Sequence, residues 1–233
     1  MLAGMVTPGS RAADVGCDHG FLSIWLVQKG ICPHVLAMDV HKGPLAAAKE
    51  HVADCGLGAY IETRLSDGLK SLTSEEADTV ICAGMGGPLM AKILAESMEK
   101  AKGMKELILQ PQSELREFRA FLRDAGFRIL EEDAVFEEGK YYFAMKAVWR
   151  GEGAEADAVK GEETQRLCDE YGRLLLERRH PVLRQYLLFR KGIVEELLGR
   201  LAARDGGRAA QRLEELQREL GMLEEALRRF RCE

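Results

Sequence analysis

The sequence predicts an α/β protein with a mostly parallel sheet, followed by a C-terminal α-helical, coiled-coil-like hairpin. Three observations support this prediction. The first domain is expected over residues 1–150, and within residues 11–150 short apolar runs alternate with helical patterns, which is typical of a parallel sheet covered on both faces. Residues 151–163 are polar and are expected to form a linker. In residues 164–233, leucines recur at spacings of three and four, as they do in packed helices.

The elements of the first domain follow from its apolar runs and the glycines and prolines between them. Strands are expected over residues 12–15, 34–39, 60–65, 78–83 and 106–110. Helices are expected over residues 21–29, 42–55, 88–98 and, capped by Ser113, up to about Asp124. Two last strands, 127–136 and 141–149, are joined by Glu137-Glu138-Gly139-Lys140, a hairpin signal. A parallel sheet closed by such a hairpin is the plan of Rossmann-like class I methyltransferases.

The C-terminal domain is expected to hold two long antiparallel helices, with the turn between them at Asp205-Gly206-Gly207. Pro181 should kink or interrupt the first helix, because proline lacks an N–H and clashes with the preceding turn. The leucine stripes are expected to form the seam of this hairpin rather than a dimer interface. The chain is therefore expected to be a monomer or a weak dimer.

Composition narrows the class of protein. The chain has 233 residues and a formal net charge of -5, so it gives no global signal for nucleic acid, although a local basic face stays open. Six cysteines occur without any Cys-x-x-Cys pair, which argues against a zinc cluster or a disulfide framework. No apolar stretch approaches the roughly 20 residues that span a bilayer. A cytoplasmic protein without metal and without membrane contact is expected.

Acids and glycines gather where the expected strands end. Ligands of open α/β sheets bind beyond the carboxyl ends of the strands. Asp39 is placed to accept hydrogen bonds from ribose hydroxyls, and Asp67 to meet an adenine amino group. Gly16 lets the backbone approach a ligand closely. Each signal alone has a structural alternative: Asp18 could cap a helix, and the glycines of 83–87 could simply form a tight strand-to-helix connection.

Five segments resemble the bacterial tRNA (adenine(22)-N1)-methyltransferase family. They are Asp14-Val-Gly-Cys-Asp-His-Gly20, Asp67-Gly68-Leu69, Ala83-Gly84-Met85-Gly86-Gly87, Leu109-Gln110-Pro111-Gln112 and Gly139-Lys140-Tyr141-Tyr142. The likeness covers nearly the whole chain, by motif up to about residue 150 and by pattern after it. It implies a Rossmann-like catalytic domain, a helical C-terminal domain, S-adenosyl-L-methionine as cofactor and tRNA as substrate.

The resemblance also implies roles for individual residues. Asp18 would be catalytic, with His19 beside it. The cofactor would contact Asp14, Gly16, Cys17, Asp39, Val40, Ser66, Asp67, Gly68, Ala83, Gly84 and Met85. The substrate would contact Gly86, Gln110, Pro111, Gln112, Lys140 and Tyr141. The chain departs from the family at Asp39, where Glu is common, and at Gln112, where Asn is common. It starts at Met1-Leu-Ala-Gly, without the family's usual opening helix that carries Ser-x-Arg-Leu.

The implied chemistry is methyl transfer to a ring nitrogen. Adenine N1 has a free lone pair at neutral pH, so alignment is the main task of the site. A carboxylate such as Asp18 would accept a hydrogen bond from the exocyclic amine and stabilise the positive charge that develops on the ring. N1 is buried in a base pair, so the target base must be unpaired or pulled out before transfer.

The protein must also bind the phosphates of a folded RNA. Basic residues cluster in the first C-terminal helical region: Arg166, Arg173, Arg178, Arg179, Arg184, Arg190 and Lys191. Of these, Arg166, Arg173, Arg178 and Arg179 are the candidate tRNA contacts. A solvated helix face is the alternative. Two other functions stay open: a methyltransferase of the same fold with another RNA or small-molecule substrate, and a non-catalytic RNA- or nucleotide-binding module.

Overall fold

The computed structural model describes residues 1–73, 75–151, 161–201 and 207–231. The chain divides into two compact units. Unit 1 comprises Met1–Asp133 and Tyr142–Ala158, and unit 2 comprises Ala134–Tyr141 and Val159–Glu233. Most of the expected linker, residues 152–160, lies outside the described residues, as does the expected turn up to Gly206.

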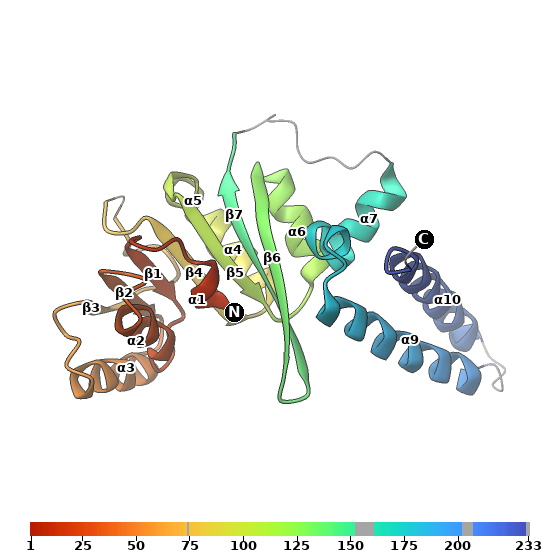
Figure 1. Cartoon of the computed structure of the whole chain (residues 1–233), viewed down its shortest axis with the longest axis horizontal. Helices are drawn as coiled ribbons and strands as arrows, with labels where there is room; N and C mark the ends of the chain where they lie inside the picture. Colours follow the sequence, from red (N-terminus) through yellow and green to blue (C-terminus); the bar gives the residue numbers. More distant parts are fainter. Residues whose placement is uncertain (74, 152–160, 202–206, 232–233) are drawn as a thin grey trace. The chain divides into compact units, whose positions relative to one another are not determined.

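The sheet confirms the predicted fold class. Its seven strands follow the order β3-β2-β1-β4-β5-β7-β6 (Figure 1). Strands β1 to β5 run parallel to their neighbours, and β7 pairs with β5 antiparallel. The strands are β1 Ala12–Val15, β2 Val35–Asp39, β3 Ile61–Leu65, β4 Thr79–Met85, β5 Glu106–Pro111, β6 Phe127–Glu137 and β7 Lys140–Trp149. Since β1, β2 and β4 are parallel neighbours, their carboxyl ends meet at one edge.

Helices cover both faces of this sheet, which explains why its strands β1, β2 and β5 are buried along their whole length. They are α1 Leu2–Met5, α2 Phe21–Gln28, α3 Lys42–Asp54, α4 Gly87–Glu96, α5 Met98–Gly103 and α6 Leu115–Asp124. Alternate residues of β2 enter two different hydrophobic clusters. Leu36 and Met38 pack with Met90 of α4, whereas Val35 and Ala37 pack with Leu26 of α2.

The structure corrects two expectations about the helices of unit 1. Ser113 does not cap α6: the residue before the helix is Glu114, in a left-handed conformation with φ 50°, and no side chain caps the helix. The opening segment, in which no helix was expected, forms the single turn α1. The short helix α5 was not predicted, because its sequence Met-Glu-Lys-Ala-Lys-Gly has no apolar period.

The start of the chain is held by a polar network at the amino end of β5. Glu106 is buried and accepts hydrogen bonds from the backbone N–H and the hydroxyl of Thr7 and from the hydroxyl of Thr79. Lys146 of β7 forms an ion pair with Glu106 at 2.7 Å. These partners hold the pKa of Glu106 below its usual value despite burial, which opposes them. The network anchors the segment that leads into β1.

In unit 2 the expected first long helix is broken twice: the predicted interruption at Pro181 is confirmed, whereas the break at Gly172 was not expected. The helices are α7 Glu162–Tyr171, α8 Arg173–Glu177, α9 Pro181–Leu201 and α10 Gly207–Arg228. Gly172, with φ 86°, separates α7 from α8, and Arg179, with φ 51°, lies between α8 and α9. Pro181 begins α9, a position where its missing N–H costs nothing.

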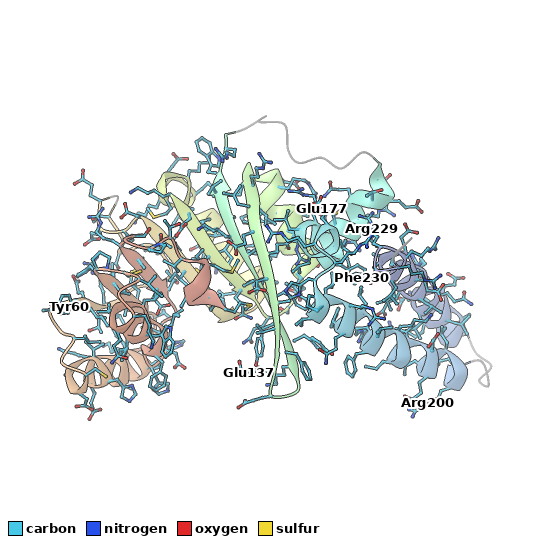
Figure 2. The ribbon with its side chains drawn as sticks, viewed as in Figure 1. Tyr60, Glu137, Glu177, Arg200, Arg229 and Phe230 are labelled. Carbon is cyan, nitrogen blue, oxygen red and sulfur yellow. The ribbon has the colours of Figure 1, made fainter. Side chains whose placement is uncertain are left out.

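Helices α9 and α10 form the expected hairpin and run side by side (Figure 1). Val194 on α9 and Leu216 and Leu223 on α10 are buried. Arg190 forms an ion pair with Glu219, and Lys191 forms one with Glu224 at 2.9 Å. Figure 2 labels Arg200 at the last turn of α9 and Glu137 at the tip of the β6–β7 hairpin. No described helix is long and apolar enough to cross a membrane.

Candidate active site

The turn after β1 is held to the neighbouring strand by its backbone. Gly16 and Cys17 donate their N–H groups to the carbonyl of Met38 in β2, at 2.8 and 2.9 Å. Gly16 has φ 74°, and a Cβ there would stand 2.9 Å from the Cε of Met85 at the end of β4. The turn therefore favours glycine for its conformation, whereas the contact with the end of the flexible Met85 side chain could be relieved by a change of rotamer. The predicted residues of β1, β2 and β4 do come together.

Asp39 joins the turn to the end of β2. Its carboxylate is 7% exposed and accepts the N–H of Asp18 at 3.2 Å on one oxygen and the N–H of His41 at 2.8 Å on the other. A carboxylate has about four acceptor positions, so each oxygen keeps capacity for a further donor. Val40 beside it is half exposed. This arrangement suits a ligand with two adjacent hydroxyl groups.

Asp14 lies within β1 and is buried, where its carboxylate accepts the hydroxyl of Ser23 from α2 at 2.7 Å. Burial raises its pKa to about 6, and the Ser23 hydrogen bond opposes this rise. Burial, followed by the charges of Asp14 and Asp39, raises the pKa of Cys17 to about 12. Cys17 is therefore a neutral thiol at neutral pH and lines the turn without acting as a nucleophile.

Asp18 presents its carboxylate to solvent. The residue has φ 49°, and its side chain is 70% exposed, with the Nε2 of His19 3.6 Å from one oxygen. The residue before α2 is Gly20, and no side chain caps that helix, so the alternative of a helix cap is excluded for Asp18. This left-handed conformation is uncommon outside glycine, but aspartate adopts it more readily than most residues.

Sequence reasoning missed an aromatic group around this turn. The ring of Phe21 stacks on His51 at 5.0 Å and on His19 at 5.9 Å between ring centres. The Nδ1 of His51, on α3, is 3.0 Å from the carbonyl of His19. Phe21 is 65% exposed although it opens an apolar helix. No sequence pattern links His51 to the turn, because His51 lies on α3 and comes close to His19 and Phe21 only when the chain folds.

The loop after β3 is held by hydrogen bonds between its own residues. The Ser66 hydroxyl donates to the carbonyl of Gly68 at 2.8 Å and accepts the N–H of Ser71. Gly68 has φ 58° and lies against Ile93 of α4. Asp67 is exposed and pairs with Lys70, whose hydrogen bond lowers the pKa of the carboxyl. Asp67 is thus an ionised acceptor on the open side of the loop.

The connection from β4 to α4 also depends on glycine. A register shift occurs between Ala83 and Met85, and Gly84, with φ 76°, donates its N–H to the Oε1 of Gln110 at 3.0 Å. A Cβ on Gly84 would meet nothing closer than the Nε2 of Gln112 at 3.9 Å. The strand end therefore offers bare backbone beside open space, a cradle that a ligand can lie against.

The residues at and after the ends of β4 and β5 complete the carboxyl edge of the sheet. Met85 faces Pro111 across the strand pair, and its carbonyl accepts the N–H of Gln112 at 2.9 Å. Gly86 stands before the first residue of α4. Gly87 has a structural role, since its N–H donates to the carbonyl of Ser113 and a Cβ there would come 2.5 Å from that oxygen.

The other predicted substrate residues belong to unit 2. Lys140 is exposed, and the ring of Tyr141 packs against Tyr186 of α9 at 5.2 Å. Arg166 and Arg173 form ion pairs within their helices, with Glu162 and Glu177. Arg178 and Arg179 are exposed and form no ion pair with another described residue. Within the described ranges, no group of three or more His, Cys, Asp or Glu side chains could hold a metal ion.

The strand order, the antiparallel strand beside β5 and the polar carboxyl edge define a Rossmann-like methyltransferase. Residues 1–145 match the model of the methyltransferase domain family, and the chain belongs to this family.

Several similar proteins are described as tRNA methyltransferases. The tRNA (adenine(22)-N(1))-methyltransferase of Bacillus subtilis is 34% identical over 146 residues, which cover 63% of this chain and 61% of that protein. The crystal structure of the Bacillus subtilis m1A22 tRNA methyltransferase matches 97% of this chain and 95% of its own, with 27% identity and a TM-score of 0.81. A Streptococcus pneumoniae protein described as a proposed tRNA (m1A22) methyltransferase, solved with S-adenosyl-L-methionine, gives 28% identity, a TM-score of 0.81 and coverage of 97% and 96%.

Proposed function

We propose that this protein transfers a methyl group from S-adenosyl-L-methionine to N1 of the adenine at position 22 of tRNA. The observation that carries the proposal is the polar edge of unit 1, where an exposed carboxylate, Asp18, stands on a turn fixed by a buried one, Asp39. The resemblance of the whole chain to proteins described as m1A22 methyltransferases, one of them bound to S-adenosyl-L-methionine, supports this substrate and this cofactor.

The residues at the edge fit the cofactor. Asp39 has free acceptor capacity for the two ribose hydroxyls, and Val40 is exposed beside it. Asp67 is an ionised, accessible acceptor for the adenine amino group. The bare backbone at Gly16 and Gly84 admits the part that carries the sulfonium, with Ala83 and Met85 beside it. Asp14 and Cys17 support the methionine part, and Ser66 and Gly68 hold the loop that presents Asp67.

S-adenosyl-L-methionine, when bound, supplies an activated methyl group on a sulfonium. The adenine N1 lone pair forms the new bond as the sulfur–carbon bond breaks, and a positive charge passes to the ring. Asp18 accepts a hydrogen bond from the exocyclic amine, which fixes the base and stabilises that charge in the transition state. Asp18 suits this role because its N–H is held by Asp39 while its carboxylate stays exposed. Gly86 and Gln112 of the same edge are candidate contacts for the base, whereas Gln110 and Pro111 are buried and would act by holding the backbone of Gly84 and Met85.

The residues that would bind the RNA phosphates belong to unit 2. Arg178 and Arg179 are exposed and form no ion pair within the described part of the chain, so their guanidinium groups are available to phosphates. Arg166 and Arg173 would have to exchange an intrahelical partner for a phosphate. Lys140 and Tyr141, which also belong to unit 2, would contact the same RNA. A tRNA substrate places the enzyme in the cytoplasm.

Two measurements test the proposal. Calorimetry with S-adenosyl-L-methionine should show binding, and no binding would leave only a non-catalytic module. Methyl transfer should then occur to tRNA carrying adenine at position 22 and should be lost when guanine replaces that adenine. Mass spectrometry of the digested tRNA should show 1-methyladenosine. Transfer that persists on the substituted tRNA would mean another target, and transfer only to small molecules would overturn the assignment to RNA.

A further inference from the structure

An aromatic cluster joins the tip of the β6–β7 hairpin to α9 within unit 2. Tyr141 lies at its centre. The ring of Tyr141 is 4.5 Å from Phe136, 5.2 Å from Tyr186 and 5.8 Å from Phe189, measured between ring centres. We call these four residues the Tyr141 cluster. Tyr141 and Tyr186 are partly buried and support the two phenylalanines.

The outer rings of the Tyr141 cluster are open to solvent. Phe136 is 45% exposed and Phe189 is 54% exposed, and Leu188 beside Phe189 is 46% exposed. Both phenyl rings are tilted against Tyr141, by 40° and 37°. Exposed apolar groups that gather in one place mark interaction sites more often than single ones do. Two rigid rings, each with an accessible area and a packed support, form a surface on which flat groups can stack.

A cationic and a polar side chain lie one helical turn before the exposed apolar pair of α9. Arg184 precedes Leu188 by four residues, and Gln185 precedes Phe189 by four, so each pair lies one helical turn apart on one side. All four side chains are exposed. The side chain of Arg184 forms no hydrogen bond or ion pair with the rest of the described chain, although its backbone N–H donates to the carbonyl of His180. Arg178 and Arg179, just before α9, add two exposed guanidinium groups to this end.

The charges on this surface are not uniform. At the hairpin tip, the exposed Lys140 is accompanied by Glu137 and Glu138, which would repel phosphates. The arginine end of α9 carries the excess positive charge. A polyanion would therefore lie along the start of α9 and reach the Tyr141 cluster from that end.

We infer that Phe136 and Phe189 form a stacking platform for unpaired nucleobases of the tRNA, with Arg184 contacting the adjoining phosphate. Recognition of RNA outside duplexes relies on bases stacked on aromatic rings next to arginine. This inference rests on the proposed function and goes beyond it, because it names the kind of nucleotide that unit 2 reads. A protein partner is less well matched, since the unpaired arginines interrupt the apolar surface.

The test measures tRNA affinity of the full-length protein with three variants at one position. Phe189→Ala removes the ring, Phe189→Leu keeps an apolar side chain without a π face, and Phe189→Trp enlarges the ring. Leu130→Ala, which removes an exposed apolar side chain from β6, is the control. Each variant is also measured for S-adenosyl-L-methionine affinity, for thermal unfolding and for mass by sedimentation.

Stacking predicts a loss of about tenfold in tRNA affinity for Phe189→Ala, equivalent to about 1.4 kcal/mol. Phe189→Leu should lose as much, Phe189→Trp should bind like the wild type, and Phe136→Ala should repeat the loss. A single-stranded RNA should compete better than its duplex. Unchanged affinity for Phe189→Ala, or full affinity for Phe189→Leu, would overturn the platform while methylation of tRNA by the wild type upholds the proposed function. A dimer that dissociates on Phe189→Ala would make this surface a protein interface and overturn the inference.

Discussion

Asp39 accepts the backbone N–H of Asp18 at 3.2 Å, so a buried carboxylate at the end of β2 fixes the residue that presents an exposed carboxylate. The two acids divide the work of the proposed site. Asp39 has both oxygens engaged by backbone donors and can hold a ribose without moving. Asp18 is positioned by its main chain, and its exposed side chain is open to the acceptor base that we propose it contacts. This division predicts that substitutions at the two positions separate cofactor binding from turnover.

Replacement of Asp18 should reduce turnover and spare cofactor affinity. Asp18→Asn removes the charge, and Asp18→Gly removes the side chain without strain, because both residues tolerate the φ of 49° at this position. We expect turnover with tRNA to fall by tenfold or more, about 1.4 kcal/mol in the barrier. Single-turnover kinetics and calorimetry with S-adenosyl-L-methionine separate the two effects. Turnover within a few-fold of the wild type in both variants would remove Asp18 from catalysis.

Asp14 should make stability depend on pH in an unusual direction. Its pKa is raised from 3.8 to about 6 by burial, so between these values the folded state keeps a proton that the unfolded state loses. Its contribution to stability is therefore complete below about pH 4, falls as the pH rises and levels off above about pH 6.

Asp14→Asn cannot ionise and keeps an acceptor for Ser23. We expect its free energy of unfolding, relative to the wild type, to rise by up to about 3 kcal/mol across this window. Urea unfolding at a series of pH values measures the difference. Ser23→Ala removes a hydrogen bond that lowers the pKa, so it should move the window to higher pH. A difference between Asp14→Asn and the wild type that is flat from pH 4 to pH 7 would contradict the raised pKa.

Two glycines of unit 1 should respond in opposite ways to an added methyl group. Gly87→Ala places a Cβ 2.5 Å from the carbonyl oxygen of Ser113, a backbone atom that cannot rotate away. We expect a loss of about 1–3 kcal/mol in the free energy of unfolding. Gly103→Ala, at the end of α5, meets nothing within 4 Å and should be neutral or stabilising. Equal stability of the two variants would show that α4 can move away from Ser113 at no cost.

Charge reversal at Arg178 and Arg179 should weaken tRNA binding and make it less sensitive to salt. Each phosphate contact contributes about 0.7–0.9 to the slope of log affinity against log salt, so losing two should flatten it by about 1.5. Arg200→Glu, at the last turn of α9, is the matched control, since Arg200 already pairs with Glu196. Affinity for S-adenosyl-L-methionine should stay unchanged. Equal salt slopes for the wild type and the double variant would assign these arginines to a solvated helix face.

Much of unit 1 could be predicted from sequence because polar residues and glycines follow or end several of its apolar strands. Asp39 and Gly16 mark such ends, and both lie at the carboxyl edge of the sheet in the structure. In unit 2 the break before Pro181 could be predicted from the proline, but the break at Gly172 and the conformation of Arg179 could not. Gly172 interrupts a leucine stripe that keeps helical spacing through it, and Arg179 adopts a left-handed conformation that its residue type does not reveal. The aromatic group of Phe21 and His51 forms where α2 and α3 meet in the folded protein, and no local sequence pattern predicts that contact.

The β6–β7 hairpin leaves unit 1 after Asp133 and returns at Tyr142. Its tip gives unit 2 an aromatic residue, Tyr141, that packs on α9. A gene segment encoding residues 164–233 would therefore produce helices that lack part of their own core. A segment ending at residue 150 would leave Tyr141 and Phe136 without Phe189 and Tyr186. A chimaera that exchanges the helices of unit 2 would therefore have to carry the tip of the hairpin with them.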